Sequence, residues 1–171
     1  MKFTNFKKVR SFIKWHPGLN NRFDYADLSN SKFEDALMQF EIFIYANLSY
    51  TVMTKAHLFL SVFTCANLNN VTLKGAFLKS VNFSHKYFIP LSDIVEADGR
   101  GYSESKVLDS GANLANADLT DSDCEEANFI KANLTGIKLK NANLKGARIE
   151  RKWKNYIATQ DVRGFNEIRW E

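Results

Sequence analysis

A large apolar residue recurs at every fifth position from Leu28 to Phe88. Only leucine, methionine and phenylalanine fill these positions, and the residue two places earlier is usually alanine, serine or threonine. A period of five matches neither the 3.6 residues of a helix nor the two residues of a strand. The pattern therefore predicts a repeat unit of five residues, with its apolar residue at the centre.

The unit reads Ala-[Asp/Asn]-[Leu/Phe]-x-x, with Asn47 and Leu48 as one example. This resembles the pentapeptide-repeat family. The resemblance implies an all-β fold, a right-handed quadrilateral β-helix in which four repeats complete one coil. It is specific for the fold and much less so for function, because one fold can host several roles.

The repeat also divides the chain. Leu114 follows Phe88 by 26 positions, one more than a multiple of five, so the repeat stops and resumes out of phase. The second set of repeats is short for an independent solenoid, so we expect it to stack on the first, giving about five coils. The expected parts are a basic N-terminal cap at 1–22, coils at 23–88, a loop excursion at 89–111, coils at 112–149, and a C-terminal helical cap at 150–171.

If four repeats make a coil, residues twenty apart stack, which predicts a ladder of phenylalanine rings along one wall. Glu41 occupies a position where other repeats place a small inward residue, so we expect the coil to be distorted there or the carboxylate to reach solvent. The predicted core consists of Phe23, Leu28, Phe43, Leu48, Phe63, Leu68, Phe83, Leu114, Leu119, Phe129 and Leu134.

Most outward positions are polar, but one group forms an apolar strip. Exposed apolar strips usually mark a contact with a partner. Two possibilities remain open: cover by the chain itself, through the segment after Phe88 or the C-terminus, or an interface with a second copy or another protein. The strip consists of Phe40, Ile42, Phe59, Leu60 and Val62, extended by Ile44 and Tyr45.

The two non-repeating segments offer further candidates. Loops carry function more often than walls do, so Arg100 and Tyr102 in the excursion are candidate partner contacts, although a packing loop is the simpler interpretation. Near the C-terminus, Trp153, Tyr156 and Ile157 have helical spacing. They predict an amphipathic helix that either caps the coils or makes a homodimer.

The net charge of +4 is concentrated at one end, because residues 1–22 hold six basic residues and no acidic one. We expect this segment to cap the solenoid; a basic helix on an anionic membrane surface is the alternative, and nucleic-acid binding is not expected. No stretch is long enough to cross a bilayer. The separated cysteines Cys65 and Cys124 fit a reducing compartment, so we expect a cytoplasmic protein.

No catalytic pattern is present among the histidines, cysteines and acids, and we expect neither an enzyme nor a cofactor or metal. The acidic run from Asp118 to Glu126 is typical of a solvated wall, and Cys124 fills an inward position. The sequence therefore predicts a non-catalytic protein–protein interaction module with an unidentified protein partner. The family resemblance implies an alternative, a DNA-mimicking regulator or protector of DNA gyrase or topoisomerase, which would require an acidic stripe along one wall.

Overall fold

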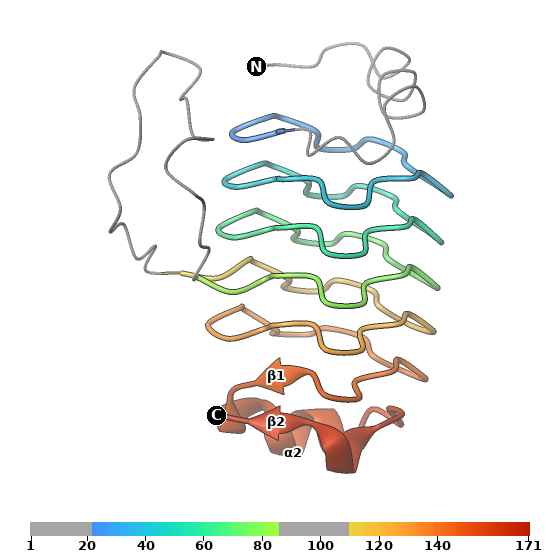
Figure 1. Cartoon of the computed structure of the whole chain (residues 1–171), viewed down its shortest axis with the longest axis vertical. Coiled ribbons are helices and arrows are strands. Elements are labelled where there is room, and N and C mark those ends of the chain that lie inside the picture. Colours follow the sequence, from blue (N-terminus) through green and yellow to red (C-terminus); the bar gives the residue numbers. More distant parts are fainter. Residues whose placement is uncertain (1–21, 86–109) are drawn as a thin grey trace.

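The computed structural model describes residues 22–85 and 110–171, which wind into a rod of stacked coils (Figure 1). Arg22 begins the described part, so the remainder of the predicted N-terminal cap lies outside it. The same holds for Phe88, Arg100 and Tyr102.

Each repeat contributes one bridging residue and one turn. Asp27 pairs in parallel with Asn47, and Asn47 pairs with Asn67. Within the repeat, the N–H of Ala26 donates to the carbonyl of Phe23 at 3.0 Å, which closes the turn to the next wall. Four such turns complete a coil, so the fold is a quadrilateral β-helix, as the family resemblance implies.

Columns of bridging residues define the four walls of the rod. The first wall carries Arg22, Ile42, Val62, Asn82, Asn128 and Arg148; the second carries Asp27, Asn47, Asn67, Asn113 and Asn133; the third carries Lys32, Val52, Thr72, Asp118 and Lys138; the fourth carries Leu37, His57, Phe77, Asp123, Asn143 and Arg163. On the second wall the amide side chains bond along the rod, as Asn133 does to Asn113 at 2.9 Å.

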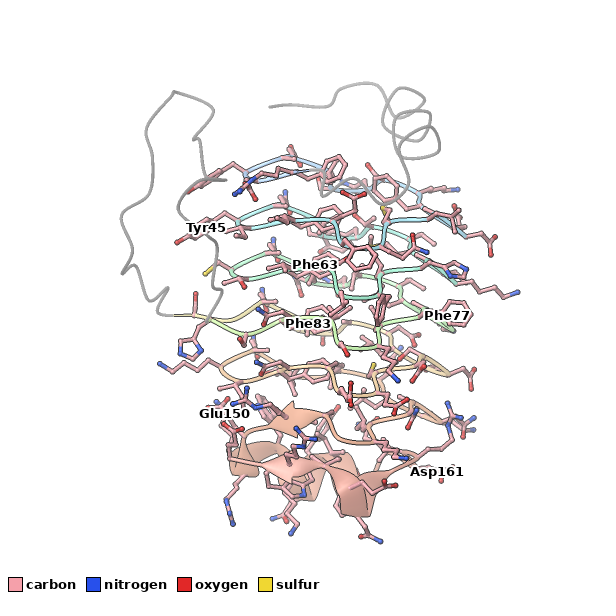
Figure 2. The ribbon with its side chains drawn as sticks, in the orientation of Figure 1. Tyr45, Phe63, Phe77, Phe83, Glu150 and Asp161 are labelled. Carbon is pink, nitrogen blue, oxygen red and sulfur yellow. The ribbon has the colours of Figure 1, made fainter. Side chains whose placement is uncertain are left out.

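The interior holds the predicted core residues, all of which are 3% exposed or less. A continuous stack of rings runs through it, with centroid distances of 5.0, 4.7, 5.4 and 5.1 Å between successive members. Phe63 and Phe83 lie near the middle of this stack (Figure 2). The stack comprises Phe23, Phe43, Phe63, Phe83 and Phe129.

The stack continues across the excursion because the chain leaves and re-enters at one corner. The N–H of Ala112 donates to the carbonyl of Phe83 at 2.7 Å, which is the bond that closes an ordinary repeat turn. A Cβ added at Gly111 would lie 2.7 to 2.8 Å from three backbone atoms, so only glycine fits this re-entry point. Asn67 consequently stacks on Asn113, 46 positions later, and the phase shift leaves the ladder unbroken.

Glu41 lies inside the coil and is fully buried, so its carboxylate does not reach solvent. The turn beside Glu41 is altered instead, which is the local distortion of the coil that was expected as the other possibility. The hydroxyl of Ser61 accepts from the N–H of Glu41 at 3.2 Å and donates to the carbonyl of Met38 at 2.7 Å. These are the two groups that an ordinary repeat turn bonds directly. The change is local, because the carbonyl of Glu41 still accepts from Val62 at 2.9 Å.

The C-terminal segment closes the end of the rod. Strand β1, Arg148–Ile149, pairs in parallel with β2, Arg169–Trp170. Between them lie η2, Arg151–Trp153, α2, Lys154–Ala158, and η3, Phe165–Glu167. Figure 1 shows these elements gathered beneath the last coil.

The predicted dimerisation residues contact the core of their own chain. Ile157 is fully buried, and Trp153 and Tyr156 pack against the same core. The Tyr156 hydroxyl donates to the carbonyl of Ile137 at 2.8 Å. The helical segment therefore packs against the coils of its own chain. Within 22–85 and 110–171, none of the helices has the length and apolar character needed to cross a membrane.

Candidate interaction surface

The apolar strip expected from the sequence divides between two walls. Ile42 and Val62, on the first wall, are each only 7% exposed and form a small cluster with Ile44, apart from the main core. This low exposure agrees with cover by the chain itself, one of the two possibilities left open for the strip.

The fourth wall is different, because large apolar side chains there remain exposed. Leu37 and Phe77 are 45% and 46% exposed, and Phe40 and Leu60 at the adjoining corner are 40% and 43% exposed. Phe59, between them, is partly buried and meets the Phe40 ring edge-on at 5.6 Å. These five residues, Leu37, Phe40, Phe59, Leu60 and Phe77, are called the apolar patch below.

The apolar patch extends over three successive coils. Leu37 and Phe77 belong to one bridging column, with His57 between them, and the rings of His57 and Phe77 stack at 4.4 Å. Figure 2 shows Phe77 pointing outward on the side of the rod opposite Tyr45. The patch is thus a continuous area on one side of the rod, separate from the covered part of the first wall.

Acidic residues follow the patch on the next coil of the same wall. Asp123 continues the column of Phe77, and Glu125 and Glu126 lie beside it. Lys79 approaches Glu125 at 3.4 Å, and the Ser80 hydroxyl donates to Glu126 at 3.1 Å. The fourth wall therefore changes from apolar to acidic across one coil boundary.

These acids do not form a stripe along the rod. Asp118 shares their coil but faces the third wall, where its column neighbours are Thr72 and Lys138. Burial acts to raise the pKa of Asp118, but the hydrogen bonds from Thr120 and the charge of Lys74 outweigh it and hold the pKa below its ordinary value. Among residues 22–85 and 110–171, none of the bridging columns carries two acidic residues in succession.

The corners beside the patch hold strained residues. Phe40 has a φ of 64° and Leu60 a φ of 57°, in the left-handed region that bulky side chains avoid. In the same corner column after the excursion stand Glu126 and Gly146. Bulky apolar residues are thus kept at positions where the backbone conformation favours glycine or asparagine.

The described residues hold no group of side chains that could bind a metal ion. In the ranges 22–85 and 110–171, no three residues among His, Cys, Asp and Glu come together as a metal site would require. Burial is the main cause that raises the pKa of the Cys124 thiol to about 12, so it stays protonated near neutral pH.

A family model for pentapeptide repeats matches residues 42–79 and 110–146 as eight copies. The chain belongs to the pentapeptide-repeat family. Its matched segments lie on both sides of the excursion, as the unbroken ladder requires. No curated protein matches the sequence.

Several solved pentapeptide-repeat structures are similar at low identity. One, from the Arabidopsis thaliana thylakoid lumen, is 16% identical over 83% of this chain and 77% of its own, with a TM-score of 0.33. Another, from Nostoc PCC 7120, is 14% identical over 100% and 98%, with a TM-score of 0.28. Full-length QnrB1, a plasmid-mediated fluoroquinolone resistance protein, is 14% identical over 89% and 83%, with a TM-score of 0.26. These likenesses carry no functional argument.

The pentapeptide repeat itself contains the signal that sequence reasoning missed. The position before the central residue is Asp or Asn in many repeats, as at Asp27 and Asn67, but it is Leu at 37 and Phe at 77. Those two large apolar residues lie in one column forty residues apart, with His57 between them. Reading this column would have added Leu37 and Phe77 to the candidate residues, although the pattern alone does not show which apolar columns are exposed.

Proposed function

We propose that this pentapeptide-repeat protein is a non-catalytic protein–protein interaction module, a rod of about five coils whose contact surface is the apolar patch. The observation that carries the proposal is the distribution of exposed apolar side chains. Among residues 22–85 and 110–171, seven large hydrophobic residues are exposed, and all of them lie from Tyr25 to Phe77. Five apolar residues gathered on one side of a rigid rod form the kind of surface that protein interfaces use.

Backbone strain supports the same proposal. A left-handed conformation costs an ordinary residue roughly 1–2 kcal/mol, and the corner at Phe40 and Leu60 bears that cost twice. An asparagine or glycine would relieve it, as residues such as Asn116 and Gly136 do at other corners. Strain that persists where relief is available points to a use for the side chains.

The gyrase-regulator alternative has less support. A protein that mimics DNA would need a stripe of negative charge along a wall. In the described residues the acids of the second set of repeats gather around one coil and are partly neutralised, with Lys74 at 3.5 Å from Asp118. We therefore do not extend the proposal to gyrase.

A capture experiment tests the proposal. The tagged full-length chain serves as bait in a lysate of the source organism, beside the double variant Leu37→Ser/Phe77→Ser. The matched control is Tyr50→Ser, since Tyr50 is 59% exposed but belongs to a second-wall repeat. We expect the wild type and the control to retain the same partner, identified by mass spectrometry, and the double variant to lose it.

Equal capture by all three baits would overturn the proposal that the patch is the contact surface. Thermal melting of each bait provides the necessary check. The substituted side chains are exposed, so all three should melt at nearly the same temperature.

A further inference from the structure

We propose that the apolar patch binds the same patch of a second copy of this chain, with the two rods antiparallel. This inference rests on the proposed function and names the partner. It is distinct from dimerisation through the C-terminal helix, whose apolar residues are already used as a cap.

Shape favours a second copy. The patch lies on a flat wall whose coils repeat at about 4.8 Å. The same wall of another copy is equally flat and has the same spacing, so its side-chain ridges can fit between those of the first. A convex partner, such as a single helix, would touch a flat wall along one line only and leave Leu37 or Leu60 uncovered.

Charge selects the direction of the two rods. In a parallel pair each coil would face its own equivalent, and Asp123, Glu125 and Glu126 would meet the same three acids of the second copy. Like charges held opposite each other in this way are destabilising. An antiparallel pair separates the two acidic groups, so it is the arrangement that the fourth wall permits.

The position of the two-fold axis follows from the apolar residues. The patch covers three coils. A two-fold axis through the middle coil places these three coils opposite the same three coils of the second copy. Phe59 and Leu60 then face their own equivalents, while Leu37 faces Phe77 of the second copy. Moving the axis by half a coil toward the C-terminus would instead place Leu37 against Asp123, which buries a carboxylate beside an apolar side chain.

The first test is the solution mass of the full-length chain by light scattering, at protein concentrations from low to high micromolar. We expect the wild type and Tyr50→Ser to rise from 19.6 kDa toward twice that value as concentration increases. Leu37→Ser/Phe77→Ser should remain at the mass of one chain throughout. Trp153→Ala identifies the competing interface, because loss of the dimer in that variant alone, with its fold intact by circular dichroism, would overturn the proposal.

The second test locates the axis by disulfide formation. In a Cys65→Ser background, Leu60→Cys should form a covalent dimer under mild oxidation, because residue 60 faces itself across the axis. The matched control, Tyr50→Cys in the same background, lies at a different corner and should stay monomeric. Equal cross-linking of the two variants would contradict the proposed register.

The inference and the proposed function fail in different ways. A wild type that stays monomeric at all concentrations overturns the second-copy proposal. If that monomer still captures another protein through the patch, the interaction module stands with a different partner. If neither a dimer nor patch-dependent capture is found, both fall.

Discussion

The coils before the excursion and those after it fill their interior alike but differ outside. In both, leucine and phenylalanine occupy most of the central positions, and the phenylalanine stack passes from Phe83 to Phe129 without interruption. Outside, residues 22–85 carry all seven large exposed hydrophobic side chains, and residues 110–149 carry none. The corner residues differ in the same sense, from Tyr50 and Leu60 before the excursion to Asn141 and Gly146 after it.

This difference distinguishes residues that the fold requires from residues that it does not require. If solvation were the only requirement on the exterior, both sets of coils would satisfy it in the same way, as residues 110–149 do with Asn, Asp, Lys and Gly. The interior cannot explain the apolar exterior, because outward side chains add nothing to the stack. Folding alone therefore does not account for the apolar side chains on the outer surface of the first set of coils.

The largest expected effect on stability comes from replacing a phenylalanine in the interior and comparing it with the same replacement on the outer surface. Phe63 is 1% exposed and stacks between Phe43 and Phe83, so Phe63→Ala should lower the free energy of unfolding by about 3–5 kcal/mol. Phe77→Ala removes the same ring from the fourth wall, where it is 46% exposed, and should cost less than about 1 kcal/mol. Urea denaturation of the two variants measures both values.

Similar losses in the two variants would break the comparison, because the fourth wall would then be part of the folding core. The slope of the denaturation curve serves as a control. It should match the wild type in both variants if each still unfolds in a single step.

The second prediction concerns the interior after the excursion, where Cys124 stands at a central position. Burial raises its pKa from 9.0 to about 12, opposed by the hydrogen bond with Ser122 and assisted by the charge of Asp123. The folded state then holds the thiol proton more tightly than the unfolded state, so stability is full below about pH 9 and falls as the pH rises toward 12. Between about pH 9 and 10.5 this thiol alone should remove about 1–2 kcal/mol.

Cys124→Ala isolates that contribution from the lysines and tyrosines that titrate in the same range. The variant should lose less stability than the wild type over this interval when both are unfolded in urea. A thiol-specific reagent offers an independent measure, since native Cys124 should react only on unfolding. Parallel pH profiles for the two proteins would show that Cys124 is not buried as an intact thiol.

Whether the burial of a residue could be predicted from the sequence depends on whether the residue faces the inside or the outside of the coil. The five-residue period determines the inward positions locally, so the burial of Phe63 and Leu114 follows from the sequence. The stacking interval of twenty residues follows from the family resemblance, which implies four repeats per coil. Exposure of an outward residue depends on what other segments cover, and local pattern holds no such information. Ile42 and Phe40 are two positions apart and are both large apolar residues at outward positions, yet Ile42 is 7% exposed and Phe40 is 40% exposed.

The repeat pattern also could not predict the backbone strain at the corners. The positions two residues after the central one accept almost any residue type, which conceals that they share a positive φ. Only the backbone shows that Tyr50, at φ 57°, and Asn116, at φ 56°, adopt the same conformation at unequal cost. Composition alone treats both as ordinary exposed residues.

The smallest expected effect tests that cost directly, by exchanging residues within one corner column. Tyr50 is 59% exposed, so Tyr50→Asn loses little packing and should stabilise the chain by up to about 1 kcal/mol, because asparagine tolerates the left-handed region. Asn116→Tyr should destabilise it by about the same amount, and the double exchange should return nearly to the wild-type value. Urea denaturation of the three variants decides the matter. Changes near zero in both single variants would mean that bulky corners carry no strain here, and the support that Phe40 and Leu60 give to a partner-binding role would then rest on their exposure alone.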